Sequence, residues 1–256
     1  MQIATFLARW RGAGGSERAN YQLFIADLCD LLEVEPPQPA SEDTRDNAYV
    51  FERRVVFHHG DGSTSNGFID CYKRGSFIGE AKKIRAGFET RQFDDALLRA
   101  RGQAENYARH LPAEEGRPPF LVVLDVGNVI ELYAEFTCTG GSYTPFPDPR
   151  SHRIRLDDLA RPEIRTRLQA VWQDPHSLDP ARRTARATRE IAGRLARVAQ
   201  SLEGNFSPER VAAFLSRCLF SMFAEDVGLL PKVENEGAFT GLLKTLKNTP
   251  EPMALL

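Results

Sequence analysis

Three residues around position 75 carry side chains that could act together on a phosphate ester. Nine residues separate Asp70 from Glu80, and only Ala81 separates Glu80 from Lys82. Two carboxylates bind a hard divalent cation such as Mg²⁺, and such an ion neutralises charge on a phosphate and lowers the pKa of bound water. A lysine beside that water can orient it, or accept its proton where its own pKa is depressed, which an arginine cannot do. The pattern predicts a metal site with a proton acceptor next to it.

The rarity of lysine makes this pattern more informative. The chain holds six Lys against 27 Arg, a bias that mostly reflects codon usage. Glu80-Ala81-Lys82 is nevertheless the only place where an acidic residue, any residue and Lys follow one another. The simpler interpretation is a surface salt bridge on a strand, and the sequence alone leaves it open.

A predicted hairpin must position these side chains. Two short strands with an Arg-Gly turn between them are expected over residues 67–73 and 76–82. Two positions apart on a strand, Glu80 and Lys82 project from the same face, while Ala81 points into the core. The hairpin would bring Asp70 beside Glu80.

The other periodicities describe an α/β domain. Apolar spacing and β-branched runs predict helices at residues 1–10, 16–33 and 92–110 and strands at residues 50–57, 120–125 and 129–136. The run FLVVLD in the fifth of these segments is almost wholly apolar, which is typical of a strand buried on both faces. This order predicts an α/β core with a mixed central sheet flanked by helices.

The C-terminal part has a different pattern. A Pro-rich break spans residues 145–149, and from about Leu156 the pattern is almost wholly helical. We therefore expect two domains, residues 1–155 and an all-helical segment at residues 156–256. The abrupt apolar end at Leu256 suggests a piece of a longer protein.

Composition narrows the class of protein. With 42% hydrophobic and 27% charged residues over 256 positions, the chain is neither a disordered tail, a collagen-like rod nor a small disulfide scaffold. The sequence shows no secretory leader and no bilayer-spanning run, so no membrane association and a cytoplasmic location are expected. The four cysteines form no CxxC pair and are expected to be small buried hydrophobes, not zinc ligands.

The distribution of charge is uneven. The net charge of −2 gives no overall sign of a nucleic-acid binder. Between Arg150 and Gln200, however, twelve Arg against six Asp and Glu give a net charge of +6. This stretch is either a set of solvated helix faces or a surface that faces DNA phosphates.

On these residues the chain resembles the PD-(D/E)XK nuclease superfamily. Asp70 corresponds to the first acid, and Glu80-Ala81-Lys82 corresponds to the E-x-K element. The sequence departs from the motif at Ile69, where the Pro that gives the family its name is missing, as it is in many members. The resemblance implies a restriction-endonuclease-like core and a Mg²⁺-dependent DNA endonuclease, with Mn²⁺ able to substitute.

A second element of the superfamily lies on the predicted helix at 92–110. Gln103 and Tyr107 in QAENY resemble the Q-x-x-x-Y element of some branches, and four residues apart they share one helix face. The resemblance implies that they line the site and contact metal-bound water or a phosphate. For Tyr107, simple core packing is an equal alternative.

The resemblance narrows to the MmeI-like, type IIL restriction–modification enzymes. The segment FSPERVAAFLSRCLFSMFAEDVGLLP at 206–231 is similar to the helical spacer that follows the nuclease in that family. There, one polypeptide also carries adenine methyltransferase and target-recognition domains, and the methyltransferase uses S-adenosylmethionine. Neither an Asn-Pro-Pro-Tyr/Phe motif nor a suitable Gly-rich loop occurs here, since Gly12–Gly15 is not preceded by a strand. Methylation and S-adenosylmethionine are therefore expected only of a full-length parent.

The resemblance also implies the roles of single residues. Asp70 and Glu80 would bind the metal with the Ala81 carbonyl as a further ligand, and Lys82 would position or deprotonate the attacking water. In-line attack would leave 5′-phosphate and 3′-hydroxyl ends, and duplex cleavage would need a second copy. Outside the motif, three basic residues could hold scissile phosphates or could be ordinary strand-edge charges: Lys73, Lys83 and Arg85. From the predicted helix at 16–33, Glu17 and Gln22 could reach the site.

Two other functions stay open at this point. The chain could be a catalytically silent nuclease-fold module that docks or clamps DNA for a methyltransferase-based defence protein. It could also be an unrelated α/β binding module in which the acids and Lys82 form a salt-bridge cluster. Convergence of Asp70, Glu80 and Lys82 in the structure is the observation that separates these readings.

Overall fold

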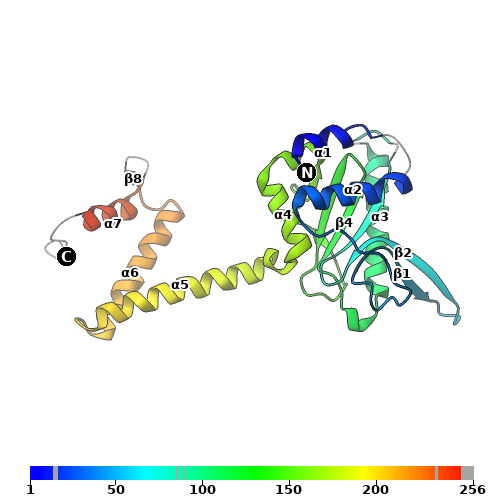
Figure 1. Cartoon of the computed structure of the whole chain (residues 1–256). Helices are drawn as coiled ribbons and strands as arrows, with labels where there is room; N and C mark the ends of the chain where they lie inside the picture. The colour runs from blue at the N-terminus through cyan, green and yellow to red at the C-terminus, as the bar shows by residue number, and fades with distance from the viewer. Residues whose placement is uncertain (14–16, 85, 89, 234–235, 249–256) are drawn as a thin grey trace. The chain divides into compact units, whose positions relative to one another are not determined.

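The structure is a computed structural model that describes residues 1–13, 17–84, 86–88, 90–233 and 236–248 (Figure 1). Internal contacts divide the chain into two compact units, Met1–Arg183 and Thr184–Leu256. Each unit is described separately below.

The described residues of the first unit form a seven-stranded mixed sheet. Its order is β1 (Tyr49–His58), β2 (Thr64–Lys73), β3 (Phe77–Lys82), β4 (Phe120–Asp125), β5 (Val129–Ala134) and β6 (Thr144–Pro145), with β7 (Arg153–Arg155) also paired to β5. Strands β3 and β4 run parallel, and the other neighbours are antiparallel. The mixed α/β core expected from the sequence is confirmed, and the strand predicted at 120–125 has those bounds.

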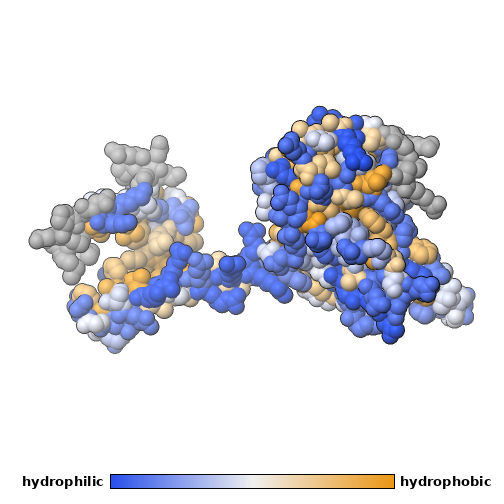
Figure 2. All heavy atoms as spheres, in the orientation of Figure 1, coloured by the Kyte–Doolittle hydropathy of each residue, from blue (hydrophilic) through white to orange (hydrophobic). Residues whose placement is uncertain are grey.

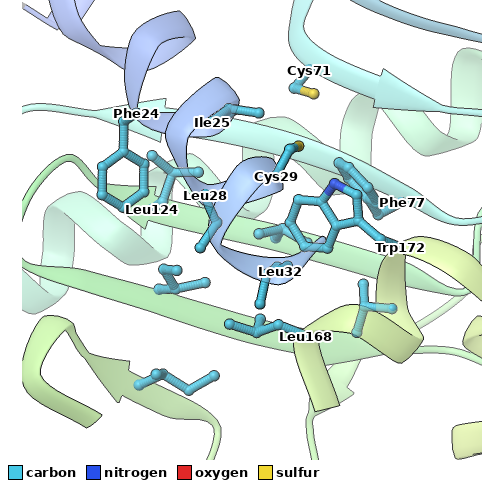
Figure 3. Close-up of a cluster of buried hydrophobic side chains, with 14 of the residues drawn as sticks. Phe24, Ile25, Leu28, Cys29, Leu32, Cys71, Phe77, Leu124, Leu168 and Trp172 are labelled. Atoms are coloured by element: carbon cyan, nitrogen blue, oxygen red, sulfur yellow. The ribbon is translucent and has the colours of Figure 1, made fainter. Parts of the chain in front are cut away.

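Helices cover both faces of this sheet (Figure 1). Helix α1 (Ile3–Trp10), helix α2 (Glu17–Leu32) and helix α4 (Pro162–Gln173) pack on one face. Figure 3 shows this core, where Leu28 and Cys29 from α2 meet Phe77 of β3 and Trp172 of α4. Because every side chain in β4 is buried, the sheet needs a helix layer on each side.

Helix α3 (Arg91–His110) covers the opposite face. It begins after Thr90, whose hydroxyl accepts a hydrogen bond from the Phe93 amide at 3.3 Å, and Pro112 follows its end. The predicted apolar stripe is confirmed, because all of its members are buried: Phe93, Leu97, Ala100, Ala104, Tyr107 and Leu111. This packing presents the polar residues beside the stripe to the edge of the sheet.

Residues 156–183, which the sequence pattern groups with the helical segment, pack on the first unit. They form the short helix η2 (Leu156–Ala160), helix α4 and the short helix η3 (Pro175–Leu178). Trp172 packs 4.4 Å from the Phe77 ring centroid and donates a hydrogen bond to the Tyr49 hydroxyl at 2.9 Å. The apolar faces of these helices therefore complete the core of the sheet domain.

The second unit is mainly helical. Helix α5 (Pro180–Glu203) begins in the first unit and continues into the second, followed by α6 (Pro208–Asp226), the β8–β9 hairpin (Lys232–Val233 and Glu236–Gly237) and α7 (Ala238–Asn248). The carboxylate of Glu225 accepts hydrogen bonds from the amide and hydroxyl of Thr240 and so joins α6 to α7. Figure 2 shows hydrophilic side chains along α5 and apolar ones exposed along α6.

Two further expectations can be compared with the structure. All four cysteines lie in described parts of the chain and none forms a disulfide; Cys29 and Cys71 are buried, whereas Cys138 and Cys218 are half-buried. Among the residues described, no helix is both long enough and apolar enough to cross a membrane.

The absence of a side chain at Gly67 in β2 lets two aromatic rings pack there. A Cβ atom at Gly67 would lie 2.6 Å from atoms of both Phe57 and Tyr107, whose rings stack with centroids 5.8 Å apart. We predict that Gly67→Ala lowers the free energy of unfolding by about 1–3 kcal/mol, because the added methyl displaces these rings. Urea unfolding measures this change.

The matched control is Gly102→Ala on the exposed face of α3. No heavy atom lies within 4 Å of a Cβ atom built there, and alanine in a helix interior is favoured over glycine by about 0.8–1.0 kcal/mol. The two glycine-to-alanine changes should therefore have opposite signs. A Gly67→Ala protein as stable as the wild type would show that the rings do not depend on Gly67.

Candidate active site

Strands β2 and β3 separate from each other beside the three predicted residues. They pair only from Cys71 opposite Gly79 to Lys73 opposite Phe77, next to the hairpin turn. Beyond this point the amide of Ala81 donates a hydrogen bond to Oδ2 of Asp70 at 2.7 Å. The carboxylate of Asp70 thus accepts a hydrogen bond from a backbone N–H group that, in a continuous β2–β3 ladder, would bond a carbonyl of β2. We call this place the β2–β3 fork.

An irregularity in β1 and β2 sets the position of Asp70. Ile69 packs in the core under α3, whereas Cys71 packs in the core under α2, although residues two apart on a regular strand share a face. On the neighbouring strand, Glu52 lies between the positions paired with these two residues and has a φ of +52°, in the left-handed region. Both strands therefore change face at the point where Asp70 and Glu52 lie opposite each other.

Glu80 and Lys82 leave β3 on the side covered by α3. Lys82 Nζ donates to Oε1 of Glu80 at 2.6 Å. Glu80 is only 1% exposed, while the Lys82 side chain is 28% exposed, so the ammonium group reaches solvent and the carboxylate does not. Ala81 is fully buried in the core under α2, as the strand periodicity predicts.

Buried Asp125 holds the chain directly after Lys82. It lies opposite Lys82 in the β3–β4 register and accepts hydrogen bonds from the Ile84 amide at 2.9 Å and from Asn128 Nδ2 at 2.6 Å. Burial raises the pKa of Asp125, and these two hydrogen bonds oppose that rise. Sequence reasoning missed this residue, because an Asp at the end of an apolar strand is usually part of an exposed turn.

Gln103 and Tyr107 on α3 reach the same place. Gln103 Nε2 donates to the Tyr107 hydroxyl at 3.1 Å. Burial raises the pKa of Tyr107, the hydrogen bond from Gln103 lowers it, and the negative charges of Glu80 and Asp70 raise it again. The hydroxyl is thus within electrostatic reach of both carboxylates, while the ring packs on Phe57. The ring therefore packs in the core, and a role of the hydroxyl in the site stays a prediction.

Helix α2 contributes a second tyrosine, which the sequence did not single out. The Tyr21 hydroxyl donates to the carboxylate of Glu52 and accepts a hydrogen bond from Gln22 Nε2 at 3.0 Å. Burial raises the pKa of Tyr21 strongly, the Gln22 bond opposes this, and the charges of Glu52 and Asp70 add to the rise. Gln22 therefore contacts Tyr21, and its reach to the site stays a prediction, whereas the side chain of Glu17 lies outside the described residues.

The flanking basic residues are placed in different surroundings. Lys73 lies at the paired end of β2, with its Nζ 4.6 Å from the centroid of the Tyr49 ring, and burial lowers its pKa. Lys83 Nζ donates to the carbonyl of Val126 at 3.0 Å. Arg85 lies outside the described residues. None of these placements tests a contact with phosphate, and those contacts remain predictions.

The donor atoms at the fork suit a hard cation. Two carboxylates, on Asp70 and Glu80, flank Ala81, whose carbonyl is a third oxygen. Among the described residues no group of three or more His, Cys, Asp and Glu gathers to hold a metal, so the site is not a closed protein cage. A set with few protein oxygens matches Mg²⁺, which keeps several waters and binds through one or two carboxylates together with substrate phosphates.

Comparison with known families covers both units of the chain. The family described as the MmeI N-terminal domain matches residues 1–205, which include the whole β2–β3 fork. The family described as the MmeI helicase spacer domain matches residues 209–255. No curated protein and no solved structure was found to match the chain. Because the first match spans well over half of the sequence, the chain belongs to the MmeI N-terminal domain family, the nuclease region of type IIL restriction–modification enzymes, followed by the MmeI spacer domain.

Proposed function

We propose that this chain is a Mg²⁺-dependent DNA endonuclease module with a PD-(D/E)XK core, in which the β2–β3 fork is the active site. The observation that carries the proposal is the convergence of Asp70 and the Glu80-Ala81-Lys82 segment. The Asp70 carboxylate is bonded to the amide of Ala81, and Lys82 is bonded to Glu80. A salt-bridge cluster alone does not explain why Asp70 bonds the segment of Glu80 and Lys82 at the point where a strand pair opens.

The carboxylates of Asp70 and Glu80, with the carbonyl of Ala81, are the groups that would hold the divalent ion. When bound, the ion supplies neutralisation of charge on the phosphate and a lower pKa for bound water. Asp70 is oriented by the Ala81 amide, which fixes one of its carboxylate oxygens against the Glu80-Ala81-Lys82 segment. Glu80 is held by Lys82 within a buried setting, where electrostatic interactions are strong.

Lys82 is the residue best placed to act on water. Its ammonium group is partly exposed and is held in place by Glu80. From there it can orient the attacking water for in-line displacement, which would leave 5′-phosphate and 3′-hydroxyl ends. Gln103 and Tyr107 offer an amide and a hydroxyl from α3 to the same water or to a phosphate oxygen.

Partners follow from membership of this family. Double-stranded DNA is the proposed substrate, and a second copy would be needed to cut both strands. We further propose that the chain acts within a longer cytoplasmic polypeptide that carries methyltransferase and target-recognition domains, where S-adenosylmethionine would bind.

A catalytically silent DNA-clamping module is the second candidate. The direct ion pair between Lys82 and Glu80 is the observation that favours it, since that pair could serve only to stabilise the sheet. Such a module would bind DNA and never cleave it, so cleavage itself separates the two functions.

Lys82→Ala tests the catalytic assignment. We predict that the wild-type chain nicks plasmid DNA with Mg²⁺ or Mn²⁺ and that this variant is slower by roughly 10²–10⁴-fold, because the group that orients or deprotonates water is gone. Lys244→Ala, at an exposed position of α7, is the matched control and should cleave like the wild type.

Circular dichroism and urea unfolding of both lysine variants establish that each remains folded. Cleavage by Lys82→Ala at the wild-type rate would remove Lys82 from the mechanism. A wild-type chain that binds DNA and leaves it intact would favour the silent module.

Tyr107→Phe separates a role in the site from a role in packing. It keeps the ring against Phe57 and removes the hydroxyl that bonds Gln103, so we predict a stability loss of about 1 kcal/mol and a cleavage rate about tenfold lower. Tyr143→Phe is the control, because it also loses one buried hydroxyl bond, to the carbonyl of Pro118, away from the fork. Equal cleavage by the two variants would leave Tyr107 with packing alone.

A further inference from the structure

A polar cavity lies in the first unit, outside the β2–β3 fork. It has a volume of about 620 Å³ and is open to solvent on one side. Five arginines line it, from β7, the turn before it and the start of α4: Arg150, Arg153, Arg155, Arg161 and Arg167. We call it the arginine pocket. Only two acidic residues, Asp158 and Glu163, share the lining, so positive charge exceeds negative charge there.

Internal ion pairs use part of this positive charge. Arg153 bonds Glu131 at 2.7 Å and Asp94 at 2.8 Å, which fixes it against the sheet. Arg161 makes longer contacts, 3.3 Å to Asp158 and 3.8 Å to Glu163, on an exposed side chain. Surface pairs of this kind contribute little, so Arg161 can exchange them for a stronger anion.

Arg167 points to a missing partner. Its Nη1 atom is buried and, within the described residues, has no hydrogen-bond acceptor. A buried guanidinium nitrogen without an acceptor is costly, and it calls for a bound water or ion. An anion in the pocket would satisfy this donor.

One residue of the pocket, Arg153, lies on the same side of the sheet as Glu80, whereas the pocket residues of α4 come from the layer on the opposite face. One row of the register joins Glu80 to Val123, Val123 to Glu131, and Glu131 to Arg153. Glu80 and Arg153 both face the α3 side, since Arg153 bonds Asp94 of that helix. Because paired strands are about 4.8 Å apart, three steps along this row span roughly 14 Å.

We propose that the arginine pocket binds a backbone phosphate of the DNA whose scissile phosphate lies at the β2–β3 fork. The inference rests on the proposed endonuclease function and extends it to a second contact. One strand of duplex DNA carries a phosphate about every 3.4 Å along the axis, so 14 Å corresponds to roughly four nucleotides. Contacts to phosphates fix the position of a protein on DNA without reading sequence, which suits a cutting module.

Two pocket arginines can be removed without disturbing the core. Arg150 is exposed and Arg161 makes only the surface pairs described above, so the full chain with Arg150→Gln and Arg161→Gln should fold. The matched control carries Arg9→Gln and Arg45→Gln, which remove the same charge from exposed pairs with Asp27 and Asp43 elsewhere on the unit. Fluorescence anisotropy with a 30-base-pair duplex, in EDTA and at several KCl concentrations, measures affinity without cleavage.

The pocket variant should bind the duplex about tenfold more weakly at 0.1 M salt. Its plot of log affinity against log salt should be shallower by about one, since the pocket takes one phosphate and each phosphate contact contributes about 0.9. The control should stay within about twofold of the wild type. Equal affinities and slopes in the two double variants would overturn the proposal.

Two further measurements distinguish DNA binding by the pocket from binding of a free anion and from DNA binding without cleavage. Calorimetry with inorganic phosphate asks whether the pocket takes a free anion; phosphate binding that depends on Arg150 and Arg161, with unchanged duplex affinity, would also overturn the DNA assignment. A wild-type chain that binds the duplex through the pocket and does not cut it with Mg²⁺ would refute the endonuclease function and leave the pocket standing.

Discussion

The hydrogen bond from the Ala81 amide to the Asp70 carboxylate is the contact on which the proposed site depends. Strands β2 and β3 must part for a substrate to approach, and parting leaves a backbone donor without its ladder partner. Asp70 accepts that donor at 2.7 Å and is thereby aimed at the Glu80-Ala81-Lys82 segment. One interaction therefore satisfies the freed backbone amide and holds the Asp70 carboxylate against the segment that carries Glu80 and Lys82.

The helices on either side of the sheet complete this arrangement. From one side, α3 lays Tyr107 across Gly67 and brings its hydroxyl within reach of the charges on Asp70 and Glu80. From the other side, α2 brings Tyr21 to Glu52, which lies opposite Asp70 on the neighbouring strand. The change of face in β1 and β2 is what allows groups from both layers to meet at one point. The proposed site is thus a product of the whole sandwich of helices and sheet.

Sequence reasoning reached the elements that local patterns encode. Alternation placed Glu80 and Lys82 on one face with Ala81 in the core, and the apolar run at 120–125 marked the buried strand beside them. The left-handed backbone conformation of Glu52 could not be predicted from the sequence, since this conformation is typical of Gly or Asn and arises here from tertiary packing. The sequence pattern likewise assigned Trp172 to the helical segment, because periodicity shows that a helix has an apolar face but does not show which surface that face packs against.

The sequence showed where positive charge gathers but not which of these side chains are paired. The excess of arginine after residue 150 was visible in the sequence, but only the structure shows that Glu131 holds Arg153 and that a buried nitrogen of Arg167 has no acceptor in the part of the chain that is described.

Crystals of the full chain grown with Mn²⁺ test the proposed metal site at the fork most directly, through anomalous scattering. We expect a manganese peak about 2.0–2.3 Å from oxygens of Asp70, Glu80 and Ala81. A crystal that binds manganese elsewhere and shows none at the fork would contradict it.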